Sequence, residues 1–146
     1  MVDLMVVLRI LMFIAGMVVI ISTIGAAIKT FVMPRGVNVW LTRFVFWLVG
    51  LFFRLRVRRA SYEARDRIMA FYAPLTLFIL PLVLLILILV GFTAVFWSID
   101  PQPLYVIFRL SGSSLLTLGY ASVDNVWFKL LEFTEATLGL LLIAIL

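Results

Sequence analysis

The chain has 146 residues, 66% of them hydrophobic, and a mean hydropathy of +1.27. Soluble globular domains are about half apolar, so this composition is typical of an integral membrane protein. The absence of Cys excludes a disulfide framework and a thiolate metal site, and the absence of His removes the commonest general base and metal ligand. The net charge of +5 is concentrated, because nine of the twelve Lys and Arg lie between Lys29 and Arg67, which argues against a nucleic-acid partner.

The first apolar segment, from about Leu4 to Ile28, is long enough to cross a bilayer, which needs about 20 residues. A cleaved signal peptide is the alternative, but the segment is too long for one and begins with Asp3 rather than with a basic region. Arg9 is expected to extend toward the membrane interface. Residues 1–28 are thus predicted to form the first transmembrane helix.

Residues 29–70 are predicted to form a basic connector. Within it, the stretch from Phe44 to Phe53 is apolar but only ten residues long, which is too short to span a membrane. Its aromatic residues and flanking arginines favour an amphipathic helix in the headgroup plane over a helix buried under the bundle. The arginines that follow it are expected to bind anionic lipids: Arg54, Arg56, Arg58 and Arg59.

Residues 71–146 are predicted to form a second span, a short helix with a loop, and a third span. The second span runs from about Phe71 to Trp97, and the turn signal DPQP follows it. Leu104 to Leu116 then predict a helix of ~20 Å, about two thirds of a ~30 Å hydrocarbon core. The third span runs from about Val126 to Leu146, and because the chain ends on apolar LLIAIL, we expect the natural protein to continue beyond it.

The predicted fold class is an all-α membrane protein. It has three transmembrane helices, one interfacial amphipathic helix, and a re-entrant pore helix plus filter loop. The positive-inside rule predicts that the connector is cytoplasmic. The N-terminus and residues 100–125 are then outside, and the protein is a multi-pass protein of the plasma (cytoplasmic) membrane.

Residues 111–121, SGSSLLTLGYA, place small hydroxyls and a glycine between apolar segments. Lipid cannot satisfy the N–H and C=O groups of non-helical backbone, so such backbone persists at membrane depth only when it is buried in protein or lines a water-filled path. A short helix followed by Thr-Leu-Gly-Tyr-Ala therefore predicts a polar path built by several copies of the chain. An ordinary polar extracellular loop is the alternative.

The order of span, short helix, Thr-x-Gly-Tyr and span resembles the pore module of the potassium-channel superfamily over about residues 72–146, and the filter of that family reads TVGYG. The resemblance implies a homotetrameric channel without a resident cofactor, in which K⁺ is the permeant ion. It also implies that backbone carbonyls replace the ion's hydration shell, at Thr117, Leu118, Gly119 and Tyr120. The Thr117 hydroxyl would lie at the inner end, and the Tyr120 ring would brace the filter from behind.

Three departures from the family pattern leave other functions open. Ala121 replaces the final Gly, which costs about 1–2 kcal/mol if that backbone needs a positive φ, so the outermost ion site is expected to be distorted or missing. Leu116 stands where the family has a second Thr, and the Asp that usually follows the signature is absent. The alternatives are a non-conducting structural or regulatory subunit with a degenerate pore loop, or a non-selective cation channel.

Ionisable groups inside membrane segments are functional candidates. Glu135 would lie ~14 Å into its helix and needs a partner. We expect a pair between Glu135 and Arg109 behind the filter, similar to the acid–arginine brace of inward-rectifier potassium channels. Glu132 is a neighbour of Glu135 on the same helix surface, and we expect it to reach outer headgroups with Lys129 instead.

Several polar residues near the filter have two interpretations each. Ser113 and Ser114 could hydrogen bond the filter backbone or cap the pore helix locally. Asp124 could gather cations at the outer mouth or be an ordinary exposed loop carboxylate. Gly139 favours close helix packing over a gating hinge. An enzyme is not expected, because no nucleophile has a visible base.

Overall fold

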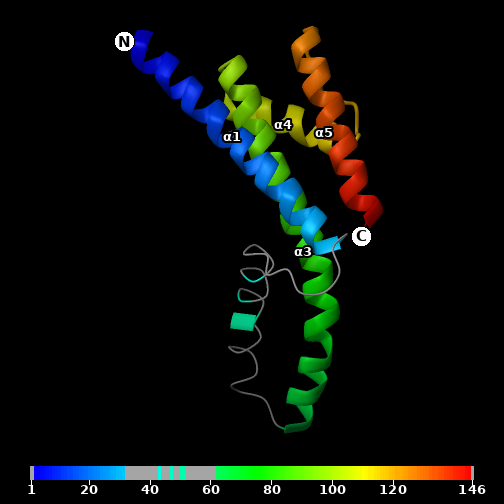
Figure 1. Cartoon of the computed structure of the whole chain (residues 1–146). Helices are drawn as coiled ribbons and strands as arrows, with labels where there is room; N and C mark the ends of the chain where they lie inside the picture. Colours follow the sequence, from blue (N-terminus) through cyan, green and yellow to red (C-terminus); the bar gives the residue numbers. More distant parts are fainter. Residues whose placement is uncertain (1, 32–42, 44–46, 48–49, 52–61, 146) are drawn as a thin grey trace. The chain divides into compact units, whose positions relative to one another are not determined.

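The computed structural model describes residues 2–31 and 62–145 and, between these ranges, residues 43, 47, 50 and 51. The secondary structure of the described residues contains helices and no strand, in the order α1 (Val2–Phe31), α3 (Tyr62–Ile99), α4 (Leu104–Leu115) and α5 (Val126–Ile145) (Figure 1). The all-α class is therefore confirmed. Most of the predicted interfacial helix lies outside the described residues, as do four predicted lipid contacts: Arg54, Arg56, Arg58 and Arg59.

Two of the described helices are long and apolar enough to cross a membrane. They are Asp3–Thr30 within α1 and Pro74–Ile99 within α3. Only 11% of the most apolar stretch of α1 is buried inside the structure, so this helix presents apolar side chains on nearly all sides. A helix that is apolar all round is typical of a protein core or a membrane span. These two helices are compatible with a transmembrane protein.

The last helix, α5, forms over Val126–Ile145 as the apolar pattern predicts. It carries Lys129, Glu132 and Glu135 in its first half, whereas the membrane-length part of α3, Pro74–Ile99, carries no charged residue. That α5 crosses a membrane stays a prediction.

The chain divides into two compact units, one made of Met1–Gly25 with Leu84–Leu146 and the other of Ala26–Val83. In the second unit, buried side chains come from both helices and include Ala26, Ala27, Thr76 and Leu80. The first unit holds α4 and the loop that follows it. Figure 1 shows α4 running crosswise between the C-terminal part of α3 and α5.

An aromatic stack lies at the centre of the first unit. The Phe96 ring on α3 is stacked on the Phe128 ring on α5, with centroids 5.4 Å apart and an interplanar angle of 17°, and Phe92 packs against Phe96 at 6.1 Å. Offset aromatic pairs add to the stabilisation from burial. The other buried apolar side chains of this unit are Ile20, Leu84, Ile88, Val95, Ile107, Leu110, Leu115 and Leu142.

Two glycines allow α1 and α3 to cross at close range within this unit. A Cβ atom added at Gly16 would lie 2.7 Å from the Gly91 carbonyl oxygen, and one added at Gly91 would lie 3.2 Å from the Gly16 carbonyl oxygen. Small residues at such crossings let helix backbones approach and gain van der Waals contact in a membrane. Neither position has room for a side chain.

We therefore expect Gly16→Leu to destabilise the first unit by about 1–3 kcal/mol, the usual cost of overpacking. Gly25→Leu on the same helix is the matched control, because a Cβ at Gly25 meets nothing within 4 Å. Thermal unfolding in detergent, followed by tryptophan fluorescence, measures both. Equal melting temperatures for the two variants would contradict the close crossing.

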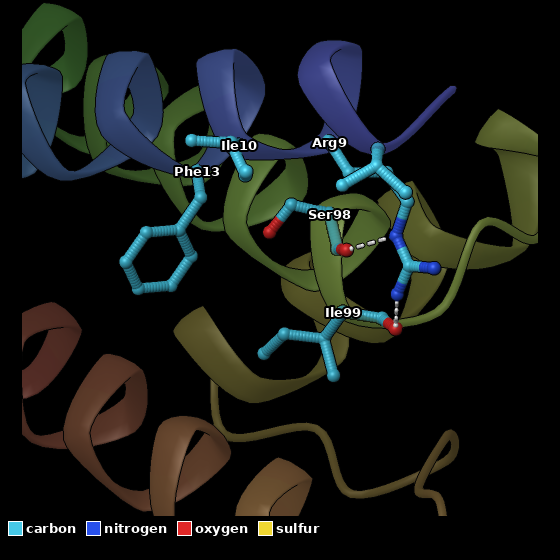
Figure 2. A pocket seen from close by; sticks show the side chains of 6 residues that line it. Arg9, Ile10, Phe13, Ser98 and Ile99 are labelled. Carbon is cyan, nitrogen blue, oxygen red and sulfur yellow. Dashed lines mark hydrogen bonds between the residues drawn. The ribbon is translucent and has the colours of Figure 1, made fainter. Parts of the chain in front are cut away.

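Arg9 on α1 caps the end of α3 instead of only extending toward the membrane interface. Its Nε donates to the Ser98 carbonyl at 2.7 Å, and its Nη2 donates to the Ile99 carbonyl at 2.5 Å (Figure 2). The last carbonyls of a helix lack partners within the helix and attract cations. Arg9 thus joins α1 to the C-terminal end of α3. The contact lies beside a pocket that Ile10 and Phe13 also line.

Candidate functional site

Helix α4 is a short helix with a sharply defined start and end. It has 12 residues, which corresponds to ~18 Å, well below the ~30 Å of a hydrocarbon core. It begins after the predicted turn, where the Pro103 carbonyl accepts the N–H of Val106 at 2.9 Å. At its other end, the N–H of Thr117 donates to the Ser114 carbonyl at 3.0 Å. The prediction of a half-length helix is confirmed to within one residue.

The backbone after α4 leaves the helix in a strained conformation. Thr117 has φ +53° and Gly119 has φ +70°. A positive φ is ordinary for glycine, but for a β-branched residue it is an outlier that costs about 1–3 kcal/mol. Such strain persists only where the surroundings hold it, and it gathers at functional sites.

The backbone of Ala121 does not have the positive φ that would make alanine unfavourable at this position. Among the described residues, Thr117 is the only non-glycine residue with a positive φ, so Ala121 adopts a conformation that any residue tolerates. The loop therefore continues past Tyr120 without a residue of positive φ at position 121. The expected penalty of Ala121 does not arise in this conformation.

The loop side chains are exposed in the single chain. Leu116, Leu118 and Tyr120 are 50%, 59% and 56% exposed, respectively. The Tyr120 ring is therefore not buried behind the loop of its own chain. Large exposed apolar side chains are typical of a surface that another protein or a membrane covers.

The predicted pair between Arg109 and Glu135 does not form. The Glu135 side chain is fully buried, and the Ser111 hydroxyl donates to its Oε1 atom. The Arg109 side chain is exposed, and its guanidinium lies 5.6 Å from the centroid of the Tyr120 ring, within the range of a cation–π contact. The reason is helical geometry, because residues two apart on an α-helix project about 200° apart.

The Ser111 hydroxyl lies within reach of acceptors on two other helices. Its single hydrogen can be donated to Oε1 of Glu135 on α5 or to the Leu89 carbonyl oxygen on α3, which lies 3.2 Å away. The Oε2 atom of Glu135 is buried and has no hydrogen-bond partner among the described residues. A buried polar atom of this kind is costly, so the single bond from Ser111 matters for the packing of α4 against α5.

The two serines predicted to support the loop have different roles. The Ser113 hydroxyl accepts the N–H of Ala121 at 3.1 Å, which is the predicted contact with the loop backbone. The Ser114 hydroxyl donates to the Leu110 carbonyl of its own helix at 3.1 Å, so it makes the local contact that was the alternative.

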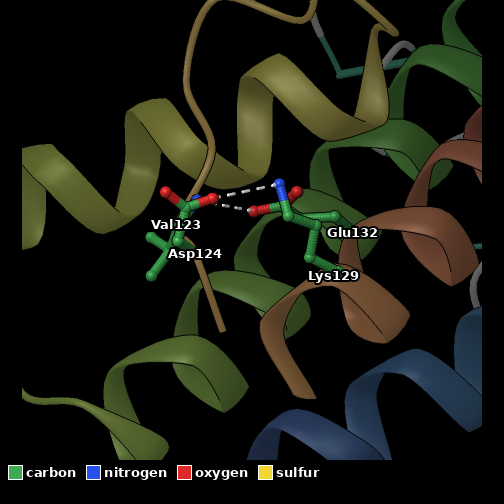
Figure 3. A network of polar contacts seen from close by, with 4 residues as sticks. All are labelled: Val123, Asp124, Lys129 and Glu132. Atoms are coloured by element: carbon green, nitrogen blue, oxygen red, sulfur yellow. Dashed lines mark hydrogen bonds and ion pairs between the residues drawn. The ribbon is translucent and has the colours of Figure 1, made fainter. Parts of the chain in front are cut away.

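A polar network holds the end of the loop against the start of α5 (Figure 3). The Glu132 side chain is 8% exposed, and its Oε1 accepts the N–H of Val123 at 3.3 Å. Lys129 pairs with Asp124 at 3.7 Å, and the Asp124 side chain is fully exposed, so this ion pair contributes little to stability. The expectation that Glu132 reaches headgroups with Lys129 is therefore wrong.

Helical spacing is the signal that would have found the role of Glu132. Phe128, Glu132, Glu135 and Gly139 recur at intervals of three and four residues, so they share one face of α5. Phe128 and Gly139 mark that face as the packed one. A Cβ atom at Gly139 would overlap the Leu115 carbonyl oxygen, which confirms close packing at this glycine.

Asp124 and Asn125 complete the boundary between the loop and α5. The Asn125 side-chain oxygen accepts the N–H of Trp127 at 3.0 Å, as helix-capping residues do. The Asp124 side chain is fully exposed and pairs with Lys129, and its place at an outer mouth stays a prediction. In the part of the chain that the structure describes, no group of three or more His, Cys, Asp and Glu residues could hold a metal ion.

The fold and the site define a helical protein with two membrane-length helices and a strained, exposed loop after a half-length helix. Comparison of the chain with known protein families, curated proteins and solved structures finds no match. A functional proposal therefore depends on the geometry of the loop itself.

Proposed function

We propose that the chain is the subunit of a homotetrameric pore-loop cation channel that conducts potassium ions. The observation that carries the proposal is the exposed, non-helical backbone of residues 116–120 at the end of the 12-residue helix α4. At membrane depth this backbone needs water, ions or protein around it, because lipid offers it no hydrogen bonds.

One copy of α4 and its loop cannot enclose a path. Several copies around an axis would place their loops together and cover the exposed side chains Leu118 and Tyr120. In the potassium-channel arrangement, backbone carbonyls replace the ion's hydration shell. The sequence Thr-Leu-Gly-Tyr and the left-handed Gly119 support the same use of the loop in this chain.

The proposal includes a membrane arrangement. α5 is the third span, the basic connector is cytoplasmic and contacts anionic lipids, and the N-terminus and loop lie outside. The charged residues of α5 are accommodated because Glu132 and Glu135 face α4 and its loop rather than lipid. Buried acids with hydrogen-bond partners are the usual form in which such residues occur in membrane segments.

The second candidate is a non-selective channel or a non-conducting subunit. The left-handed Thr117 favours it, because a strained threonine changes the direction of the carbonyl at the inner end of the loop. The two candidates share the same tetramer and differ in ion flux.

The test is ion flux through purified protein in liposomes, with potassium and sodium measured in parallel. We expect potassium flux to exceed sodium flux and to disappear in Gly119→Asp, since aspartate at φ +70° adds both strain and charge at the loop. Gly25→Ala is the control, because Gly25 has open space around it. Equal fluxes that Gly119→Asp removes would establish a non-selective pore. Absence of flux from folded tetramers would establish the non-conducting subunit.

A further inference from the structure

The return of the loop toward α5, residues Ala121–Asp124, is held by two buried acceptors on different helices. The N–H of Ala121 donates to the hydroxyl of Ser113 on α4, and the N–H of Val123 donates to the carboxylate of Glu132 on α5. Ser113 is 1% exposed and Glu132 is 8% exposed. Both acceptors are thus fixed by packing, whereas the return segment has no regular secondary structure.

Two acceptors of Ser113 hold two peptide units of the loop, one in its side chain and one in its main chain. Its hydroxyl accepts the N–H of Ala121, and its own carbonyl accepts the N–H of Leu118 at 2.8 Å. The described chain has no cis peptide bond, and in a planar trans peptide the C=O points opposite to the N–H. The carbonyls of Thr117 and Tyr120 belong to these two peptide units. Both are therefore directed away from α4.

Glu132 controls the next fixed peptide unit. Its bond to the N–H of Val123 directs the carbonyl of Ser122 away from the carboxylate. Lys129 does not compete for this carboxylate in the structure, because it pairs with Asp124 (Figure 3). This hydrogen bond is long, at 3.3 Å, and it joins the return segment to the packed face of α5.

We infer that Ser113 and Glu132 are positioning residues that aim the carbonyls of the loop and so determine which cation it accepts. Held in this way, the return segment needs no left-handed glycine at position 121, and Ala121 is accommodated. The effect on cation choice rests on the proposed function. The orientation of the loop by these two side chains does not, and it has a readout of its own.

Four variants and one control test this inference. Glu132→Leu and Ser113→Ala remove the acceptors. Glu132→Gln and Ser113→Thr each keep an oxygen that can accept the same N–H and are expected to behave like the wild type. Ser114→Ala is the control, because it removes a neighbouring hydroxyl that bonds only its own helix. All are compared as purified proteins that elute like the wild type.

The first readout is hydrogen exchange of the loop amides. We expect Glu132→Leu to speed exchange at Val123, and Ser113→Ala to speed it at Ala121, by about tenfold, the equivalent of one such hydrogen bond. The oxygen-retaining variants and Ser114→Ala are expected to leave these rates unchanged. Unchanged exchange in both Glu132→Leu and Ser113→Ala would overturn the inference.

The second readout is the ratio of potassium to sodium flux, which is expected to fall toward one in the two variants that lack an acceptor. Faster exchange with an unchanged flux ratio would overturn the effect on cation choice. Faster exchange in these two variants, together with a wild-type protein that carries no flux, would support the positioning role and overturn the proposed channel function. The two claims therefore fail in distinguishable ways.

Discussion

Gly139→Ala is expected to destabilise the protein, whereas the same substitution at Gly112 is expected to stabilise it. A Cβ at position 139 would overlap the carbonyl oxygen of Leu115 and lie 3.1 Å from its carbonyl carbon. The obstacle is backbone at the end of α4, so one of the two helices must move. At Gly112 the nearest atom to an added Cβ is the Leu89 Cδ1 at 3.8 Å, an ordinary contact.

Both positions lie in helices, so both substitutions gain about 1 kcal/mol of helix propensity. Only Gly139→Ala also incurs the cost of overpacking, and we expect the two variants to differ by on the order of 3 kcal/mol. Thermal unfolding in detergent measures this difference. A Gly139→Ala protein as stable as Gly112→Ala would mean that α5 does not approach α4 as closely as the structure has it.

The second large effect is expected at the buried contact between Ser111 and Glu135. Ser111→Ala leaves a fully buried carboxyl group without a hydrogen-bond partner among the described residues, because its other oxygen already has none. Leaving such a group unpaired costs about 1–3 kcal/mol, and more if it is charged. We expect Ser111→Ala to lower the melting temperature and to loosen α4 from α5.

The double variant Ser111→Ala with Glu135→Met separates this explanation from a simple loss of volume. Replacing both members of a buried polar pair by apolar groups is often nearly neutral, so the double variant is expected to recover most of the stability that Ser111→Ala loses. Additive losses would show that the hydrogen bond contributes little and that Glu135 has another partner. Arg109→Gln is the control, since Arg109 is exposed and does not contact Glu135.

The sequence by itself determined that the described chain is helical and where most of its helices lie, but it wrongly placed residues 62–70, the start of α3, in the connector. Uniform apolarity predicts α1 and the membrane-length part of α3, because a long segment that is apolar on every side is typical of a membrane span or a core helix. The turn residues 100–103 and the hydroxyl-rich stretch that ends in TLGYA predict the start and end of α4 to within one residue. These features are local, and local chemistry is sufficient to specify them.

The tertiary structure alone decided the partners of the polar residues. Glu135 pairs with Ser111 rather than Arg109 because the crosswise packing of α4 turns the Ser111 face toward α5 and leaves the Arg109 face exposed. Glu132 holds the loop because the Gly139 face of α5 packs on α4. Such pairings join residues that are distant in sequence. They depend on which faces of two helices meet, and the hydropathy and spacing within one helix do not predict this.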